Sequence, residues 1–312
     1  MEYRELGKTG IRVSEVGFGA WAIGGDAWGP VEDGDSIAAM ERALELGVNV
    51  IDTADVYGDG HSEKLVGEVI AGRRQDVVVS TKGGLMGHHR DPEQGPVYDR
   101  PSKVTEAFEA SLRRLRTDYI DVYWCHIWWD NDRETEAFTR AFEELKDSGK
   151  ARAVGISTDN IDHLRHFGET GVIDAVQLDY SILNRKPESD LLPYAEEHAL
   201  GAVIRGPLFK GLLTGKFGSE STFGPGDIRH GWPSEPWYAE SMAKVGRLRR
   251  LVREDQTPGQ LALRFVLGHP AVSVTIPGAK NPNQVEQNAA ASRRPLLSPG
   301  ELHEIDAIAP AP

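Results

Sequence analysis

Short apolar runs alternate with amphipathic helical stretches along nearly the whole of this 312-residue chain. Each apolar run ends abruptly in a polar residue or a glycine, and eight can be read from the sequence, at residues 16–19, 48–52, 77–82, 120–126, 151–157, 174–178, 202–205 and 272–276. A run that is apolar throughout predicts a strand buried on both faces, as in a parallel sheet covered by helices. Eight strand–helix units favour a closed (β/α)8 TIM barrel over an open doubly wound sheet.

The stretches between these runs predict helices by the spacing of their apolar side chains. Val104, Phe108, Leu112 and Leu115 recur at helical intervals, so we expect a helix from about residue 102. Earlier in the chain, Ser62 is the expected N-cap of a helix that runs to about residue 70. Further helices are expected near 161–167, 188–199, 240–254 and 258–268, with another that begins near residue 283.

A segment before the first strand predicts a β-hairpin. Residues 3–6 and 11–13 flank the turn Gly7-Lys8-Thr9-Gly10, and we expect this hairpin to close the N-terminal end of the barrel. Residues 216–238 form a long insertion rich in Gly, Pro and Trp after the seventh strand. Because no low-complexity tract or linker divides the chain, residues 1–312 are expected to form one domain.

Charge and cysteine content limit the classes of function. The formal net charge is −13 at pH 7, which argues against nucleic acid or an anionic membrane as a general partner. Cys125 is the only cysteine, so no intramolecular disulfide is expected. The first residues lack the apolar stretch of a signal peptide, and no apolar run is long enough for a membrane-spanning helix. We therefore expect a soluble, cytoplasmic protein.

Polar side chains stand at the ends of three successive predicted strands. The second strand ends at Asp52, with Tyr57 five residues further on, while the third ends at Lys82 and the fourth at His126. The carboxyl ends of the strands share one rim in a (β/α)8 barrel, so these four side chains are expected to converge. Each also has a structural alternative, because a strand-end Asp often caps the next helix and a lone Lys usually reaches solvent.

Together the four residue types suit proton donation to an oxygen that is becoming negatively charged. Reduction of a carbonyl by hydride leaves charge on the oxygen, which needs a donor in place as the charge forms. A phenol has a pKa of about 10 and is a poor acid at neutral pH, but a lysine ammonium beside it stabilises the phenolate. We expect Lys82 to lower the pKa of Tyr57, Asp52 to fix Lys82, and His126 to orient the carbonyl oxygen or join the proton relay.

These residues lie in stretches that resemble the aldo-keto reductase family. The stretches are IDTADVYG (51–58), STK (80–82), DYIDVY (118–123), CH (125–126), GKARAVGIS (149–157), GLLTGK (211–216) and IPGA (276–279), which follow the family's order and cover nearly the whole chain. The Gly24-Gly25 loop with Trp28-Gly29, together with residues 205–208, resembles the bacterial branch typified by an inositol-operon reductase. The resemblance implies an oxidoreductase that reversibly reduces an aldehyde or ketone, with Asp52, Tyr57, Lys82 and His126 as its catalytic tetrad and Tyr57 as the acid.

The resemblance also implies that NADP(H) binds in extended form at the C-terminal face of the barrel, without a Rossmann domain. Ser157 and Gln177 match positions that hydrogen-bond the nicotinamide carboxamide, and Lys280 is the candidate for the 2′-phosphate. The implied cofactor-binding residues are Trp21, Asp52, Ser157, Gln177, Arg205, Gly206, Pro207, Leu208, Gly211, Lys216, Gly278, Lys280, Gln284 and Asn288. Three positions depart from the family pattern, with Thr158 in place of the usual Asn, Arg205 in place of a common aromatic residue, and Gln284 in place of an arginine found in some relatives. The last departure leaves NAD(H) use open.

Aromatic side chains gather in the predicted rim loops, where such clusters tend to form ligand pockets. The expected substrate pocket comprises Trp21, Trp28, Tyr57, His126 and Trp128, and flat rings suit a sugar face or an aryl carbonyl. The alternative is that several of the rim aromatics pack the 216–238 insertion against the barrel. No metal is expected, because His88-His89 and Cys125-His126 lack a second pair at zinc spacing.

Other classes of function stay open at this level. A redox-sensing, cofactor-binding module, as in potassium-channel β subunits, would share the fold and the tetrad but show little turnover. A barrel isomerase or lyase would not use a nicotinamide cofactor. The basic run at 247–250 is either a solvated helix face or a contact with another subunit, so a homo-oligomer is an open alternative.

Overall fold

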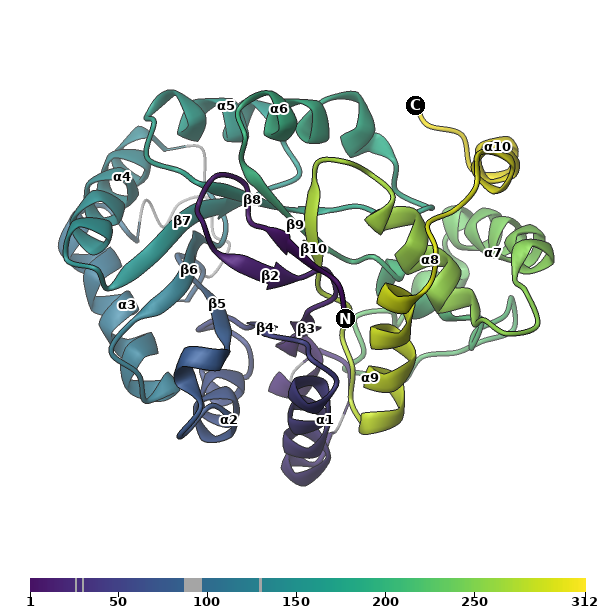
Figure 1. Ribbon diagram of the computed structural model, residues 1–312, viewed down its shortest axis with the longest axis horizontal. Helices are drawn as coiled ribbons and strands as arrows, with labels where there is room; N and C mark the ends of the chain where they lie inside the picture. The colour runs from purple at the N-terminus through teal and green to yellow at the C-terminus, as the bar shows by residue number, and fades with distance from the viewer. Residues whose placement is uncertain (26, 30, 87–96, 129–130) are drawn as a thin grey trace.

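Eight parallel strands form the centre of the molecule (Figure 1). The computed structural model describes residues 1–25, 27–29, 31–86, 97–128 and 131–312. Neighbouring strands pair in sequence order from β3 to β10. Their bounds are β3 Phe18–Gly19, β4 Val50–Asp52, β5 Val78–Gly83, β6 Ile120–Cys125, β7 Ala151–Ser157, β8 Ala175–Asp179, β9 Gly201–Arg205 and β10 Val272–Thr275.

The two edges of this sheet meet and close it. Val16 and Gly19 form parallel bridges with Thr275 and Gly278, which brings the β3 segment beside β10. The backbones approach closely at this seam, since a Cβ on Gly19 would lie 2.5 Å from the carbonyl oxygen of Ile276. The predicted (β/α)8 barrel is therefore confirmed, and its seam depends on a glycine.

Helices form a ring outside the strands (Figure 1). Each strand is followed by at least one helix before the next strand begins, as the βαβ connection requires. The last helix has no counterpart among the predicted ones, although Ser298 and Glu301 form a capping box at its start. The helices are α1 Asp33–Glu45, α2 His61–Val69, α3 Pro101–Leu115, α4 Asp132–Asp147, α5 Ile161–Glu169, α6 Leu191–Glu197, α7 Pro236–Leu248, α8 Pro258–Leu267, α9 Pro282–Ala289 and α10 Pro299–Ile308.

The start of α2 differs from the prediction. The N-cap is Gly60 in the left-handed conformation, with φ at 82°, and Ser62 lies inside the first turn. The Ser62 hydroxyl donates to the carbonyl oxygen of Ala20 at 3.0 Å and contacts the Thr53 hydroxyl at 2.8 Å. The prediction that Ser62 caps this helix was wrong, because the hydroxyl instead ties α2 to the loops that follow β3 and β4.

Two apolar layers stabilise the barrel, one inside the strands and one between the strands and the helices. Alternate residues of each strand face the two layers, so Val122 and Trp124 of β6 lie inside while Tyr123 packs outward against Phe108 of α3. Full burial of an apolar side chain such as Val122 or Phe108 contributes about 1.5–3 kcal/mol to the stability of the fold. These layers make the strands a rigid frame for whatever projects from their ends.

The N-terminal hairpin closes one end of the barrel, as predicted. Strands β1 Tyr3–Glu5 and β2 Arg12–Ser14 pair antiparallel and lie across the ring of strands in Figure 1. Leu6 and Ile11 of the hairpin belong to the interior apolar cluster. Gly7 lets the turn approach the start of β9, because a Cβ there would lie 2.4 Å from the backbone nitrogen of Gly201.

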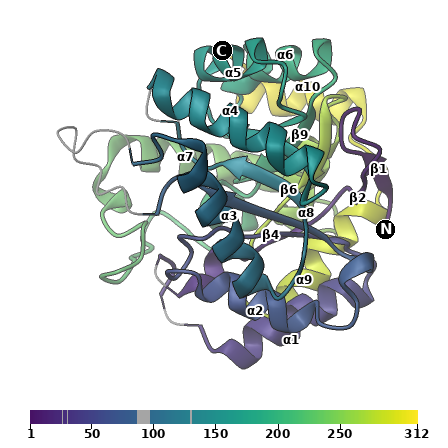
Figure 2. The same ribbon diagram turned by 90° about the vertical axis from the view of Figure 1, so that its left-hand side faces the viewer.

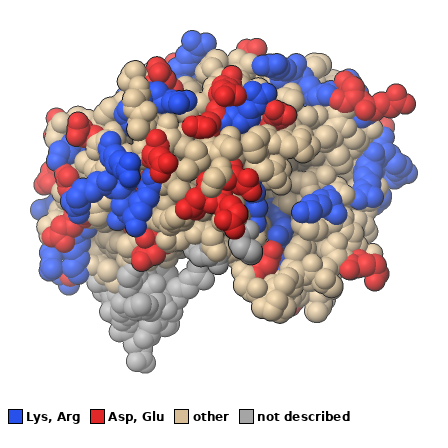
Figure 3. All heavy atoms as spheres, turned by 90° about the horizontal axis from the view of Figure 1, so that it is seen from below, with Lys and Arg blue, Asp and Glu red and all other residues tan. Residues whose placement is uncertain are grey.

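The carboxyl ends of the strands form the opposite rim, where the long loop after β9 projects away from the hairpin (Figure 2). This loop meets the loop after β3, since Trp28 pairs with Asp227 and the Ile228 backbone donates to the Ala27 carbonyl at 3.0 Å. Acidic and basic side chains are interspersed on the face drawn in Figure 3. Within the described ranges, the helices are all too short or too polar to cross a membrane.

Candidate active site

A buried ion pair stands at the end of β4 and β5. Lys82 is fully buried, and its ammonium donates to Asp52 Oδ1 at 2.6 Å and to the carbonyl oxygen of Thr53 at 2.7 Å. Asp52 Oδ2 accepts from Ser80 Oγ at 2.6 Å and from Gln177 Nε2 at 2.8 Å. A buried charge is costly unless it is paired and hydrogen-bonded, and both charges here meet that condition. The pair therefore fixes the position of the ammonium.

The Tyr57 phenol is the third group that Lys82 reaches. Lys82 Nζ lies 3.3 Å from the Tyr57 hydroxyl, to which it donates. The Tyr57 ring stacks on Trp21 at 6.0 Å between centroids and meets the His126 ring edge-on at 5.8 Å. The His126 backbone donates to the Gly83 carbonyl at 2.8 Å, which holds this residue against β5. The structure thus brings together Asp52, Tyr57, Lys82 and His126, as the strand-end argument predicts.

Burial and charge set the protonation states of these groups. Burial lowers the pKa of Lys82, but its interactions with Asp52 and Tyr57 together outweigh burial, and the net pKa lies above the ordinary value. Burial raises the pKa of Tyr57 above 10, and the Lys82 charge opposes only part of that rise. The Lys82 charge thus acts on the Tyr57 pKa in the expected direction, but burial outweighs it and the net pKa lies above the ordinary value. The phenol keeps its proton at neutral pH.

His126 is neutral at neutral pH. Burial lowers its pKa well below the ordinary value, and the charges of Lys82 and Arg205 lower it further. Its Nδ1 is a buried polar atom that has no hydrogen-bond partner among the described residues. A neutral imidazole beside a protonated phenol can orient an oxygen atom without adding a charge to the site.

The next strand ends carry the residues expected at the nicotinamide. Ser157 at the end of β7 is in register with Gln177 of β8. Gln177 already donates to Asp52, so its side chain links this part of the rim to the ion pair. At the position that departs from the family pattern, the Thr158 backbone donates to the Gln177 carbonyl at 2.9 Å.

Arg205 ends β9 and is held by two carboxylates that the sequence analysis did not single out. It forms ion pairs with Asp159, which follows β7, and with Asp179 of β8 at 3.5 Å. Burial lowers the pKa of Arg205, but the two carboxylates outweigh it and raise the net value. The signal available in the sequence was that each acid lies at or just after a strand end.

Gly206 begins the turn in which residues 206–208 lead from β9 into the 3-10 helix Phe209–Thr214. Its φ is +65°, and a Cβ would lie 2.6 Å from Asp179 Oδ2. Only glycine fits both conditions without strain. The backbone of Pro207, Leu208 and Gly211 continues from this turn along the rim, with the Leu213 and Gly211 amides donating to the Leu208 carbonyl.

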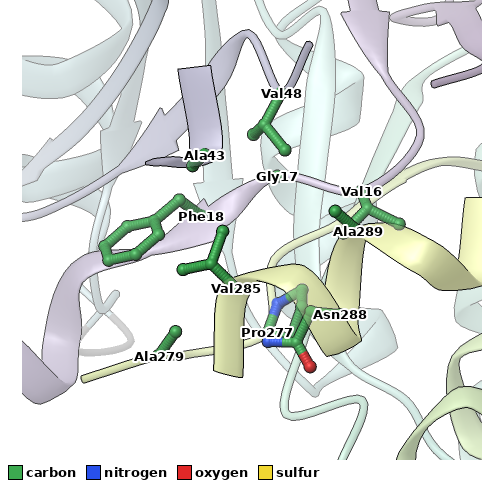
Figure 4. Close-up of a pocket in the computed structure, with 10 residues that line it drawn as sticks. All are labelled: Val16, Gly17, Phe18, Ala43, Val48, Pro277, Ala279, Val285, Asn288 and Ala289. Carbon is green, nitrogen blue, oxygen red and sulfur yellow. The ribbon is translucent and has the colours of Figure 1, made fainter. Parts of the chain in front are cut away.

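The start of α9 gathers the residues expected at the adenosine end of the cofactor. Asn281 caps the helix by accepting from the Gln284 backbone at 3.1 Å, and Gln284 Oε1 accepts from the Lys280 backbone at 2.8 Å. Asn288 Nδ2 lies 3.5 Å from the Gly278 carbonyl oxygen. Asn288 also lines a cavity of about 10 Å³ between the β3 segment, α1 and α9 (Figure 4). That cavity is too small for a ligand larger than water.

Three cations lie near one another beside this helix. Lys280 Nζ donates to the Trp28 carbonyl at 2.5 Å. Burial lowers the pKa of Lys280, and the charges of Arg229 and Lys216 lower it further. The Arg229 guanidinium lies 5.0 Å from the Trp28 ring and binds both carboxylate oxygens of Asp227. Arg229 was missed by the sequence analysis because only the folded loop brings it here.

The rim tryptophans lie in three separate places. Trp21 lies against both Tyr57 and Trp28, with the two indoles edge-on at 5.1 Å, so Trp21 stands beside the tetrad and Trp28 beside Trp21. Trp128 is buried and its ring stacks on His166 of α5 at 4.8 Å. Trp232 of the long loop contacts Trp237 in the first turn of α7 at 5.0 Å between ring centroids. The packing alternative thus describes Trp232, which packs against the apolar core, whereas Trp237 is exposed and Trp128 lies against a helix.

Possible metal ligands are described for only part of the chain. Over the ranges that the structure describes, His, Cys, Asp and Glu side chains form no group of three or more that could hold a metal ion. His88 and His89, considered above as metal ligands, lie outside those ranges.

Comparison with known proteins matches the chain to one family over most of its length. The sequence model described as "Aldo/keto reductase family" matches residues 15–310. The "Aldo-keto reductase YhdN" of Bacillus subtilis is 36% identical over 92% of this chain and 87% of that protein. The "NADH-specific methylglyoxal reductase" of Escherichia coli is 35% identical over 92% of each. A crystal structure of an aldo/keto reductase from Klebsiella pneumoniae in complex with NADP and acetate has a TM-score of 0.75 and 28% identity, covering 100% of this chain and 97% of that one.

Proposed function

The chain belongs to the aldo/keto reductase family, and from that premise we propose that it reversibly reduces an aldehyde or ketone with NADP(H), with Tyr57 as the proton donor. One observation carries the proposal more than any other. Lys82 Nζ lies between Asp52, at 2.6 Å, and the Tyr57 hydroxyl, at 3.3 Å. This is the arrangement that a phenol needs in order to give up its proton and remain stabilised afterwards.

The residues at the rim fit the cofactor that the family uses. The cations Lys216, Arg229 and Lys280 lie beside the N-terminus of α9, where an adenosine phosphate would find charges and backbone N–H groups together. Ser157 and Gln177 would bind the nicotinamide carboxamide, and residues 206–208 with Gly211 would meet the pyrophosphate. Gln284 and Asn288 would bind the adenine and ribose. When bound, the cofactor supplies or accepts the hydride.

The choice between NADP(H) and NAD(H) rests on opposing observations. Lys280, with Lys216 and Arg229 close by, favours a 2′-phosphate. Gln284 stands where some family members carry an arginine, and one relative that is 35% identical is named as NADH-specific. We propose NADP(H) as the preferred cofactor, with NAD(H) as a weaker alternative.

The proton step follows from the protonation states of the tetrad. A phenol with the ordinary pKa of about 10 is protonated at neutral pH, and burial raises the pKa of Tyr57 further, so the acid carries its proton before the reaction. As charge develops on the substrate oxygen, the phenol transfers this proton, and the Lys82 ammonium stabilises the phenolate that remains. Asp52 keeps Lys82 charged and in place. The neutral imidazole of His126 orients the carbonyl oxygen of the substrate toward the Tyr57 hydroxyl.

The substrate class is proposed from the aromatics beside Tyr57. The Trp21 ring stacks parallel to the Tyr57 ring, and Trp28 stands edge-on to Trp21. Flat apolar walls of this kind suit a sugar or an aryl carbonyl. Trp128 is a weaker candidate, because its ring lies against α5.

A substrate panel followed at the nicotinamide absorbance tests the function. We expect multiple turnovers with aldehydes, faster with NADPH than with NADH. A protein that binds NADPH tightly but completes a single turnover would instead be the redox-sensing module. If NADPH fails to quench the tryptophan fluorescence and no aldehyde is reduced, the oxidoreductase proposal is wrong.

A further inference from the structure

The loop that carries Tyr57 also contains a buried carboxyl group, Asp55. Past the end of β4 the chain keeps pairing with β5, since the Thr53 amide donates to the Ser80 carbonyl at 2.8 Å and the Asp55 amide donates to the Lys82 carbonyl at 3.2 Å. Successive side chains of such a segment point to opposite faces. Asp52 faces the barrel interior, and Thr53 faces α2, where it contacts Ser62. Asp55 therefore faces the helices, on the same side as Thr53.

The Asp55 carboxyl is buried, and one of its oxygens, Oδ1, lacks a hydrogen-bond partner among the described residues. The residue is 1% exposed. Tyr123, which packs outward from β6 into the same layer, likewise has a buried hydroxyl that is unpartnered in the described part of the chain. A carboxylate is expensive to bury unless a cation and hydrogen bonds compensate it.

Arg114, the cation that acts most strongly on Asp55, is already engaged by another carboxylate. Glu63 of α2 is fully buried and accepts from Arg114 Nε of α3 at 2.5 Å and from Thr81 Oγ1 at 2.6 Å. Glu63 thus pairs with the arginine, whose charge also acts on Asp55. The other titratable groups that act on Asp55 are Lys82 of β5, which faces the barrel interior, and the phenols of Tyr123 and of Tyr98 before α3.

These surroundings favour the protonated acid. Burial and the nearby Glu63 carboxylate raise the pKa of Asp55 to about 7, and Arg114 opposes only part of the rise. Glu63 keeps its counter-ion, so the proton resides on Asp55 below neutral pH.

We propose that Asp55 is a positioning residue of this active site, which must carry a proton for the Tyr57 loop to stay docked on β5. Loss of the proton leaves a carboxylate without a free counter-ion, and the charge is relieved if the side chain moves toward Arg114 or solvent. That movement strains the hydrogen bond from the Asp55 amide to the Lys82 carbonyl, and Asp55 is two residues from Tyr57. The distance between the Tyr57 hydroxyl and Lys82 Nζ then becomes variable.

Hydrogen exchange of the cofactor-free protein tests the docking directly, without reference to catalysis. After correction for intrinsic rates, we expect the peptide that spans residues 53–60 to lose about tenfold in protection between pH 6 and pH 8.5. Asp55→Asn, which keeps the shape but cannot ionise, should lose less than twofold. The matched control is Asp59→Asn, which removes the same charge from an exposed position of the same loop and should follow the parent. Equal losses in the parent and in Asp55→Asn would overturn the proposal.

The pH profile of kcat/KM for a generic aldehyde gives the second readout, and this readout alone rests on the proposed function. Above neutral pH the parent and Asp59→Asn should lose up to tenfold per pH unit, while Asp55→Asn should stay within about twofold of its value at pH 6.5. A merely structural role for Asp55 would lower all rates but leave the shape of the profile unchanged. No reduction by any variant at any pH would refute the proposed function, while the exchange experiment would still decide the role of Asp55.

Glu63→Gln keeps the proposal testable even if Asp55→Asn does not fold. Removal of the Glu63 charge frees Arg114 and relieves the like charge on Asp55, so Asp55 should ionise at a lower pH. The loss of protection over residues 53–60 should then begin at least one pH unit lower than in the parent. An unchanged or higher onset would contradict the proposal.

Discussion

The stability of Asp55→Asn should rise relative to the parent as the pH increases. Some carboxyl groups have a higher pKa in the folded than in the unfolded protein. Ionisation of such a group lowers the free energy of unfolding as the pH rises from the pKa of the unfolded state to the pKa of the folded state. For Asp55 those values are 3.8 and about 7. At 1.36 kcal/mol per pKa unit, the full cost approaches about 4 kcal/mol above pH 7, and it is essentially absent below pH 3.8.

The measurable part of this cost lies between pH 5 and pH 8. Over that interval the free energy of unfolding of Asp55→Asn, minus that of the parent, should increase by about 2.5 kcal/mol. Any fixed cost of placing an amide in the pocket cancels in this comparison. Urea denaturation followed by tryptophan fluorescence at pH 5, 6, 7 and 8 gives the values, with Asp59→Asn as the control that should stay parallel to the parent. A difference that does not change with pH, or that falls, would refute the assignment of a raised pKa to Asp55.

Two further predictions concern the rim. Lys280→Met should raise the Kd for NADPH about 10- to 150-fold and leave that for NADH within twofold, as measured by fluorescence titration, because a charge-assisted hydrogen bond contributes about 1.5–3 kcal/mol. Equal losses for both cofactors would contradict a 2′-phosphate role. Gly206→Ala should lower the free energy of unfolding by about 2 kcal/mol in urea denaturation, since it places a Cβ 2.6 Å from Asp179 Oδ2 at a φ of +65°. Gly218→Ala, which meets nothing within 4 Å, is its control, and an equal effect of both substitutions would refute the steric argument.

The parts of the fold and site that could be predicted depend on local pattern. Eight apolar runs were enough to indicate a barrel, because each parallel strand is buried on both faces and carries that burial in its own sequence. Once the barrel is assumed, the strand ends share a rim, and Asp52, Lys82 and His126 are brought together by geometry alone.

The parts that could not be predicted depend on contacts between distant segments. Asp159 and Asp179 pair with Arg205 across three strand ends, and Arg229 reaches Trp28 through the folded loop. Ser62 matches the composition of an N-cap, but tertiary contacts with Ala20 and Thr53 use its hydroxyl instead. The sign of the Tyr57 pKa shift depends on burial, which is a property of the packed molecule.

The most direct test of the proposed chemistry is turnover by Tyr57→Phe, compared with its affinity for NADPH. If the phenol is the acid held by Lys82 and Asp52, kcat for a small aldehyde should fall by about 10²–10⁴-fold while the Kd for NADPH stays within about twofold of the parent value. A Tyr57→Phe protein that reduces the aldehyde at the parent rate would contradict the account.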